Sequence, residues 1–361
     1  MLTELLRIVR RDVLFVSTSP IDEVWTRTTA IRCHAAGLSV EVAICGGGGR
    51  DNALVEPYRS VGIPVRVGVS LAAAAGMRCA MVVTASSGLN RRILPTRAKL
   101  LVHMPHSLAS LHMIYPADAF DGYDVLLAAG PQHEAEFDAI AAARGLVGRS
   151  ARAAGYGKLD VLAHCAVQRA PYSRQPPCVL LAPSWGPDNL LDRCGVPLAT
   201  ALAEREFDVV LRPHPLFYVE RAPVLDAVAA LSNRHPRVRL ESPFDGDDAI
   251  FDADVLVGDY SGAGFEFAAL RRRPIVSVDV GLKIVNPDWC ALGLDPVEVA
   301  CRSLLGPVVA PDVATIVDAV QSCAGAPASV SDDVVARFLH GRPGECGERA
   351  AGLIEQLLST G

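Results

Sequence analysis

The sequence lacks the features that mark several classes of protein. None of its ten cysteines belongs to a CxxC pair, which argues against a zinc ribbon or a thioredoxin-like redox site. No apolar run reaches the ~18–20 residues that cross a bilayer, and the first twelve residues carry five charges where a signal peptide has its apolar core. We therefore expect a cytoplasmic protein whose thiols are reduced and mostly buried, with peripheral association with a membrane left open.

An excess of basic residues is also missing. The chain has 34 lysines and arginines against 40 aspartates and glutamates, for a formal net charge of −6. Proteins that bind nucleic acid usually carry a basic surface, so we expect no nucleic-acid partner. With 50% hydrophobic and 20% charged residues, the composition is that of an ordinary globular protein. Because one core stops growing near ~250–300 residues, a chain of 361 residues predicts two domains.

Short apolar runs alternate with helical patterns along the chain. In the first half we expect helices over 21–36 and 131–144 and strands over 13–18, 39–45, 64–69, 79–84, 99–104 and 125–129. In the second half we expect strands over 178–183, 208–213, 238–240, 254–258 and 274–279, and helices over 190–206, 219–231, 247–253, 262–271, 311–322, 331–339 and 347–359. This alternation predicts an α/β protein with two Rossmann-like domains that face a cleft.

A segment with three prolines and no apolar periodicity, residues 166–177, predicts a linker between the two halves. We expect one Rossmann-like domain over 1–165, a second over 178–345, and a C-terminal helix over 346–361 that packs back on the first. Ligands of such sheets bind at the carboxyl ends of the strands. Polar residues directly after predicted strands are therefore the candidates for a site.

LRPHP (211–215) follows a predicted strand of the second half. Arg212 can hold a phosphate through two parallel hydrogen bonds. His214 lies between two prolines, which restrict the backbone on both sides. The pair suits a pyrophosphate leaving group, and a surface turn with a solvated arginine is the alternative.

GDYSGAGFEFAAL (258–270) joins a strand end to a helix start. Backbone N–H groups at a helix N-terminus form an anion site, and Gly262 lets a phosphate approach them. Ser261 adds a hydroxyl donor, and Glu266 lies one turn into the helix, where a ribose hydroxyl could meet it. The alternative is a tightly packed turn in which Asp259 or Ser261 caps the helix.

HMPHSLASLH (103–112) follows a predicted strand of the first half. His106 could act as the general base toward an acceptor hydroxyl. One alternative is a histidine satisfied within the core. Another is a metal site formed with His103 and His112, but the segment lacks the HExxH spacing and a carboxylate ligand, so we expect no metal.

Two shorter motifs also end predicted strands. In APSW (182–185), Ser184 and Trp185 would face the cleft, where the indole could stack on a base or simply pack in the core. In STSP (17–20), Ser17 and Thr18 could help to hold an acceptor.

Together these motifs resemble those of the CDP-glycerol glycerophosphotransferase family, the polyol-phosphate transferases of teichoic-acid and capsule synthesis. APSW, RPHP, and DYSG followed by FEFAALRRRPIV resemble the family's nucleotide half. HSL at 106–108 resembles its HG histidine motif, and GYGKLD (155–160) resembles its G-x-P-R-x-D turn. The resemblance covers about 103–280, or roughly half of the chain.

The resemblance implies a GT-B-type fold with an acceptor-binding N-terminal domain and a donor-binding C-terminal domain. His106 and His214 would be the catalytic residues, Ser17, Thr18 and Ser107 would bind the acceptor, and no cofactor or metal would be needed. His106 would deprotonate an acceptor hydroxyl that attacks the β-phosphorus of CDP-glycerol and expels CMP. The nucleotide and its pyrophosphate would be bound by Ser184, Trp185, Arg212, His214, Asp259, Tyr260, Ser261, Gly262 and Glu266.

The sequence departs from the family's pattern at four positions. Gly258 and Gly262 stand where the family has serine, Lys158 stands where it has arginine, and HSL lacks the glycine of the HG motif. Two other functions therefore stay open: a GT-B glycosyltransferase or sugar-nucleotide epimerase that uses a UDP- or GDP-sugar, and a non-catalytic nucleotide-binding scaffold. The acceptor is expected to be a polyol or a glycan, and the oligomeric state is not determined by the sequence.

Overall fold

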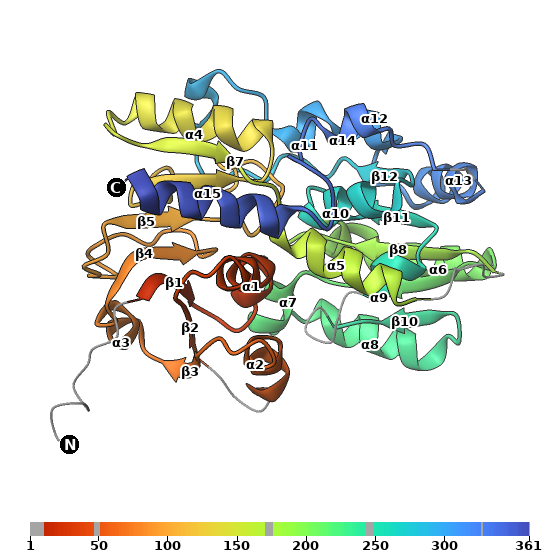
Figure 1. The fold of residues 1–361 in the computed structure, drawn as a ribbon. Coiled ribbons are helices and arrows are strands. Elements are labelled where there is room, and N and C mark those ends of the chain that lie inside the picture. Colours follow the sequence, from red (N-terminus) through yellow and green to blue (C-terminus); the bar gives the residue numbers. More distant parts are fainter. Residues whose placement is uncertain (1–10, 47–50, 170–175, 243–247, 326–327, 361) are drawn as a thin grey trace, which may run out of the picture. The chain divides into compact units, whose positions relative to one another are not determined.

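The structure is a computed structural model that describes residues 11–46, 51–169, 176–242, 248–325 and 328–360. The chain divides into two compact units. The first contains residues 1–163, 288–294 and 339–361, and the second contains 164–287 and 295–338. Each unit is a parallel sheet with helices on both faces, so the prediction of an α/β protein with two Rossmann-like domains is confirmed (Figure 1).

The sheet of the first unit has seven strands in the order β3-β2-β1-β4-β5-β6-β7, and every pair of neighbours is parallel. Its central strands are nearly continuous apolar runs because helices cover both faces. The strands are β1 (Arg11–Ser17), β2 (Val40–Cys45), β3 (Val65–Val69), β4 (Cys79–Thr84), β5 (Leu100–His103), β6 (Val125–Ala128) and β7 (Ser150–Ala153).

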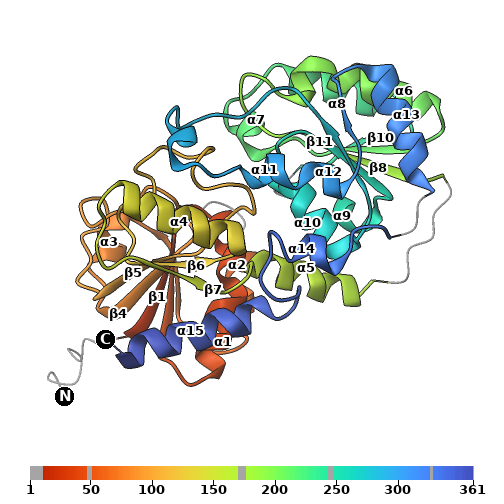
Figure 2. The same ribbon diagram turned by 90° about the horizontal axis from the view of Figure 1, so that it is seen from above.

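Helices α1 (Arg27–Ala35) and α15 (Cys346–Thr360) share a core with one face of this sheet, and α3 (Leu71–Ala75) and α4 (Pro131–Ala143) share a core with the other (Figure 2). Phe15 faces the first core and Leu14 the second, as the alternation of a strand requires. The remaining helical segments are η1 (Asp22–Trp25), α2 (Asp51–Arg59), α5 (Gly157–Val167) and η3 (Trp289–Leu292).

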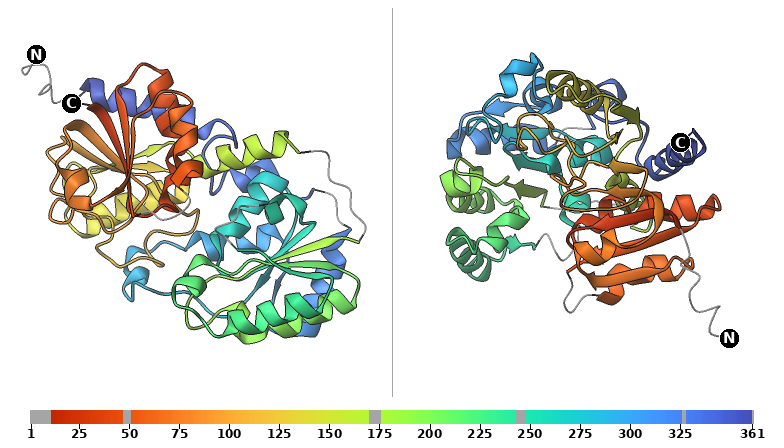
Figure 3. Two further views of the ribbon diagram at one scale, coloured as in Figure 1. Left: turned by 90° about the horizontal axis from the view of Figure 1, so that it is seen from below. Right: turned by 90° about the vertical axis from the view of Figure 1, so that its left-hand side faces the viewer.

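The second sheet has six parallel strands in the order β10-β9-β8-β11-β12-β13. They are β8 (Cys178–Ala182), β9 (Asp208–Leu211), β10 (Val238–Leu240), β11 (Val255–Gly258), β12 (Ile275–Val278) and β13 (Val308–Val309). Helices α6 (Val196–Glu204), α8 (Val224–Arg234) and α13 (Val313–Ala324) pack on one face, and α10 (Gly262–Arg271) lies on the opposite face (Figure 3). The short segments are η2 (Leu191–Gly195), α7 (Pro215–Val219), α9 (Asp248–Asp252), α11 (Val297–Ala300), α12 (Arg302–Leu305) and α14 (Asp332–Val335).

Several predicted boundaries are wrong for local reasons. The helix expected over 219–231 begins at Val224, because His214 caps a separate short helix, α7, that ends at Val219. The helix expected over 331–339 is a single turn, α14. Strands β7 (SARA) and β13 (VV) were not predicted, because their sequences carry too little apolar periodicity for a strand. Helix α5 was not predicted either.

Some predictions concern residues whose structure is not described. Residues 170–175 of the expected linker and residues 1–10 lie outside the described residues. All ten cysteines are described; each is a free thiol, eight are buried, and Cys165 and Cys290 are exposed. No helix in the described part of the chain combines the length and the apolarity that a bilayer-spanning segment needs.

Asp160 joins α5 to the start of α15. Its carboxylate accepts hydrogen bonds from the backbone N–H groups of Gly344 (2.8 Å), Cys346 (3.0 Å) and Gly347 (2.6 Å). These are N–H groups at a helix start, which have no partner within the helix. Gly347 lets α15 approach α1, because a Cβ there would lie 2.9 Å from that of Thr28. Asp160, from the GYGKLD motif, therefore anchors the C-terminal helix.

Replacing Asp160 with Ala should destabilise the first unit by about 3 kcal/mol, because two buried N–H groups and a helix N-terminus lose a charged acceptor. Asp160→Asn keeps one acceptor oxygen and should lose about half as much. Urea-induced unfolding followed by circular dichroism measures both values. The control is Asp121→Ala, which removes an exposed ion pair with Arg144 and should cost less than about 1 kcal/mol. Equal losses for Asp160→Ala and Asp121→Ala would contradict the anchoring role.

Candidate functional site

When the strands are counted from the first one of each unit, both sheets contain the doubly wound order 3-2-1-4. In this order the chain adds strands first on one side of strand 1 and then on the other. The winding changes between β1 and β4 in the first unit and between β8 and β11 in the second. The loops at such a point leave toward opposite faces, and the strand ends between them are where ligands bind. Each unit therefore has one predicted position for a site, and polar residues lie at both.

In the second unit, Asp259 bridges the two strand ends. It follows β11, and its carboxylate oxygens accept hydrogen bonds from the backbone N–H groups of Ser184 (2.7 Å) and Leu190 (2.9 Å) in the segment after β8. Burial raises the pKa of Asp259, and the two N–H donors oppose that rise. Asp259 thus holds the APSW segment against β11.

Lys283, in the loop after β12, reaches the same segment. Its ammonium group donates a hydrogen bond to the Ser184 hydroxyl (2.6 Å) and lies 4.3 Å from the centre of the Trp185 ring. Burial lowers the pKa of Lys283 to about 8. The Trp185 ring also lies 6.3 Å from the ring of His214, which follows β9. A cation, an indole and an imidazole from three strand ends therefore meet at one edge of the sheet.

The residues of RPHP differ in accessibility. His214 caps α7, since its Nδ1 accepts a hydrogen bond from the Leu216 N–H (3.2 Å), which leaves Nε2 as the nitrogen that can carry the ring proton. The Arg212 side chain is only 10% exposed, and its Nε lies 3.7 Å from the Glu241 carboxylate. Glu241 also accepts a hydrogen bond from Arg239 (2.8 Å). Arg212 therefore adds positive charge near this edge of the sheet, rather than an exposed guanidinium that could hold a phosphate through two hydrogen bonds.

The start of α10 has the predicted form. Ser261 is the N-cap residue, and its hydroxyl oxygen accepts a hydrogen bond from the Ala263 N–H (3.3 Å). Gly262 is the first helical residue. Glu266 lies on the buried side of the helix and is 5% exposed. The positive end of the helix dipole and the serine hydroxyl thus lie at the carboxyl end of β11.

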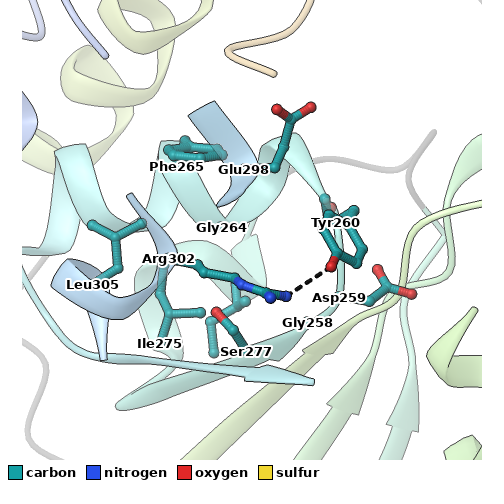
Figure 4. A pocket seen from close by; sticks show the side chains of 12 residues that line it. Gly258, Asp259, Tyr260, Gly264, Phe265, Ile275, Ser277, Glu298, Arg302 and Leu305 are labelled. Carbon is teal, nitrogen blue, oxygen red and sulfur yellow. Dashed lines mark hydrogen bonds between the residues drawn. The ribbon is translucent and has the colours of Figure 1, made fainter. Parts of the chain in front are cut away.

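A small hollow, open to solvent, lies beside α10 on the side of β12 (Figure 4). The Tyr260 hydroxyl at its mouth donates to Asp279 (3.1 Å) and accepts from Arg302 (2.7 Å), which lies on α12. Burial raises the pKa of Tyr260. Tyr260 is 5% exposed, so it acts mainly as a support between the ends of β11 and β12.

In the first unit, a carboxylate again bridges the strand ends at the change of winding. Asp22 accepts hydrogen bonds from Thr18, after β1 (2.7 Å), and from Ser86, after β4 (2.8 Å). The two hydroxyls also lie 2.7 Å apart. Ser17 is buried at the end of β1. Thr18 therefore belongs to a polar cluster, and Ser17 lies beneath it.

The ring of His106 is held at both nitrogens. Its Nδ1 lies 2.7 Å from the Ala85 carbonyl, which makes Nδ1 the donor, and its Nε2 lies 3.0 Å from the Tyr115 hydroxyl. The ring also contacts Trp25 edge-on, with centroids 5.6 Å apart. The neighbouring Ser107 hydroxyl accepts from the Ala109 N–H (3.1 Å). His106, in the segment after β5, is thus held in one orientation against the residue that follows β4, and Nε2 can take another proton only if Tyr115 gives up or relays this hydrogen bond.

The two other histidines of this segment lie in the core. His103 is 1% exposed, and burial lowers its pKa well below the usual value. His112 lies 3.1 Å from the Glu136 carboxylate and 3.2 Å from the Leu294 carbonyl. Among the described residues, no group of three or more histidine, cysteine, aspartate or glutamate side chains could hold a metal ion.

Sequence reasoning missed Lys283, Asp22 and Ser86. Lys283 is a lone charge in the apolar segment VGLKIV after a predicted strand, and that contrast was a usable signal. Asp22 lies inside the segment predicted as a helix, and Ser86 follows β4 in an unremarkable ASSG. Only the strand order shows that these two residues meet.

Comparisons with known proteins show similarity of fold. No family model matches the chain, and no curated protein matches its sequence. A protein assigned as a UDP-N-acetylglucosamine 2-epimerase from Listeria monocytogenes superposes with a TM-score of 0.64 at 12% identity, covering 98% of both chains. The UDP-GlcNAc 2-epimerase from Neisseria meningitidis, solved with UDP-GlcNAc bound, has a TM-score of 0.56 at 12% identity and covers 96% of this chain and 100% of its own. A glycosyltransferase from Rickettsia africae has a TM-score of 0.53 at 13% identity, covering 98% and 97%.

These similarities assign a GT-B-type fold and overturn the resemblance to the CDP-glycerol glycerophosphotransferases. The structural neighbours are UDP-N-acetylglucosamine 2-epimerases and GT-B glycosyltransferases. The reason for the error lies in where the motifs fall. APSW, RPHP and DYSG end β8, β9 and β11, the three adjacent strand ends at which a doubly wound sheet binds its ligand. Such motifs report the kind of site and not the family.

Replacing Asp259 with Asn should destabilise the second unit by about 2 kcal/mol, because the amide keeps one acceptor oxygen and leaves one of two backbone N–H groups without a partner. Thermal unfolding with and without urea measures the loss. Asp188→Asn is the matched control. Asp188 is exposed, its ion pair among the described residues is with Arg193, and the loss should stay under about 1 kcal/mol. A wild-type melting profile for Asp259→Asn would show that the bridge contributes nothing.

Proposed function

We propose that this protein is an enzyme that uses a nucleotide-activated sugar, and that the second unit binds the donor at the carboxyl ends of β8, β9 and β11. The observation that carries the proposal is the meeting of Trp185, His214 and the start of α10 at that edge. An indole face suits a base or a sugar ring, and an imidazole with a helix N-terminus suits a diphosphate. The fold shared with an epimerase solved with UDP-GlcNAc supports the same assignment.

The donor-binding residues would divide into two groups. His214, Ser261 and Gly262 would contact the diphosphate, while Arg212 adds positive charge close behind them. Trp185 would stack on the base, and Glu266 would accept a hydrogen bond from a ribose hydroxyl. The buried Asp259, Tyr260 and Ser184 would position these groups, since Asp259 and Tyr260 are already engaged by neighbouring residues.

The first unit would bind the acceptor through the cluster of Thr18, Asp22 and Ser86, with Ser17 next to Thr18 in sequence and Ser107 next to His106. The reaction would be glycosyl transfer. An acceptor hydroxyl loses its proton and attacks the anomeric carbon, the bond from that carbon to the diphosphate oxygen breaks, and the nucleoside diphosphate leaves. His106, held by Ala85 and Tyr115, would take the proton once Tyr115 relays it.

Epimerisation of the sugar nucleotide is the second candidate, because three of the structural neighbours are assigned as epimerases. The two reactions differ in their products. A glycosyltransferase consumes acceptor and releases a nucleoside diphosphate, whereas an epimerase returns an isomeric sugar nucleotide without any acceptor. Product analysis by mass spectrometry and nuclear magnetic resonance separates the two reactions, and binding without turnover would indicate a scaffold.

The first test is a thermal-shift screen against UDP, GDP, CDP and the sugar nucleotides of UDP and GDP. A ligand present at 100 times its dissociation constant adds about 2.7 kcal/mol of stability, which is visible as a raised melting temperature. A shift with a nucleoside diphosphate and its sugar derivative is the expected result. The absence of a shift with every compound would contradict the proposal.

Replacing His214 with Ala should weaken the binding of the nucleoside diphosphate at least tenfold, because the diphosphate loses a donor. Isothermal titration calorimetry gives the dissociation constants. His235→Ala is a matched control: His235 belongs to the same unit, and its Nδ1 accepts from the Arg237 N–H in the same local pattern. Equal effects of the two substitutions would mean that His214 only caps α7.

A further inference from the structure

Lys283 occupies an unusual place in the loop that follows β12. The neighbouring side chains Leu282, Ile284 and Val285 are 41%, 50% and 37% exposed, while the charged side chain turns inward. A lysine normally keeps its ammonium group in water and packs its stem against apolar surface. Only three of the 34 basic residues of the chain are lysines, and Lys283 is one of them.

The contacts of Lys283 orient its charge without neutralising it. The Ser184 hydroxyl accepts one hydrogen bond (2.6 Å), and the Trp185 ring lies beneath the ammonium at 4.3 Å. Both partners are uncharged. Among the described ion pairs, none joins Lys283 to a carboxylate within 4 Å. A buried ammonium held in this way has lost much of its hydration, and the attraction of Asp259 and Glu298 compensates that loss only in part.

We propose that Lys283 is the specificity-determining phosphate ligand of the donor site, held by Ser184 and Trp185 so that the diphosphate supplies its counter-charge. This inference rests on the proposed function, because it concerns the same site. The ammonium lies beside Trp185, whose ring lies 6.3 Å from that of His214, at the edge to which the diphosphate was assigned. A dianionic phosphate would gain a charge-assisted hydrogen bond, and a neutral analogue would not.

The proposal has a consequence for pH. The pKa of Lys283 is lowered to about 8 by burial, against the attraction of Asp259 and Glu298. Below that pH the ammonium is charged and can bind phosphate. Above it the free protein loses the proton, so binding must take the proton up again and the affinity falls. The groups that face Lys283 are Asp259 after β11, Glu298 on α11, and His214 across the Trp185 ring.

The test measures the binding of UDP by calorimetry between pH 7.0 and 9.5, where its terminal phosphate is already ionised. Inorganic pyrophosphate is measured at pH 7.0 only, because it loses a proton of its own within that range. For the wild type, affinity should fall up to about thirtyfold by pH 9.5, since about one molecule in thirty then carries the proton. Lys283→Met should bind about tenfold more weakly at pH 7.0 and show little fall. Lys283→Arg should stay charged throughout and keep its affinity.

The control for pH is built into the Lys283→Arg variant, which retains Asp259, Glu298 and His214. A fall in affinity that persists in Lys283→Arg comes from those groups and would overturn the proposal.

Lys283→Met should be at least as stable as the wild type at pH 7.0, because it replaces a buried charge by an apolar chain of similar length. With only three lysines, amine labelling read by mass spectrometry can report the titration of Lys283 itself and its protection by UDP.

The outcomes separate this inference from the proposed function. Tight UDP binding that Lys283→Met leaves unchanged would refute the role of Lys283 and leave the donor site standing. Binding of pyrophosphate through Lys283 without binding of any nucleotide would support the phosphate ligand and refute the nucleotide-sugar function. If neither UDP nor pyrophosphate binds, both proposals fail.

Discussion

One kind of interaction holds both candidate sites together: a carboxylate that bridges two strand ends at the change of winding. Asp259 joins the segments after β8 and β11 through two backbone N–H groups. Asp22 joins those after β1 and β4 through two hydroxyls. At this point of a parallel sheet the two loops leave the strand ends toward opposite faces. Their first polar groups lie close together beyond the last hydrogen bonds between the strands, so they need other hydrogen-bond partners. A short acidic side chain at the junction meets that need.

The rest of the second site is arranged around the Asp259 bridge. Because Asp259 holds the backbone of Ser184, the Ser184 hydroxyl has a defined place at which to receive Lys283, and the Trp185 ring is presented to the ammonium and to His214. α10 starts three residues after Asp259, so the helix dipole is directed at the same edge. The proposed binding groups from the segment after β8 and from the start of α10 thus lie on either side of one buried carboxylate.

Two motifs from the sequence are held by hydrogen bonds within the first unit. Asp160 of GYGKLD caps the N-terminus of α15, which is a structural role. His106 of HSL is held between Ala85 and Tyr115, and it keeps its proposed role as the base. GYGKLD resembled a functional motif because polar residues that begin helices satisfy backbone groups as well as bind ligands. The family resemblance was wrong for the same reason. The donor site is still proposed at the ends of β8, β9 and β11, where the other motifs lie.

The sequence by itself determined the fold class and the positions of eleven of the strands. Apolar runs of three to seven residues alternate with helical patterns, and that alternation favours a parallel sheet covered by helices. It also indicated which strands end in polar segments. Only the tertiary structure decided which of those segments meet, since strand order depends on long-range pairing that local periodicity does not encode. Lys283 approaches Ser184 from 99 residues away, and Ser86 approaches Thr18 from 68, so both contacts exist only once the sheets have formed.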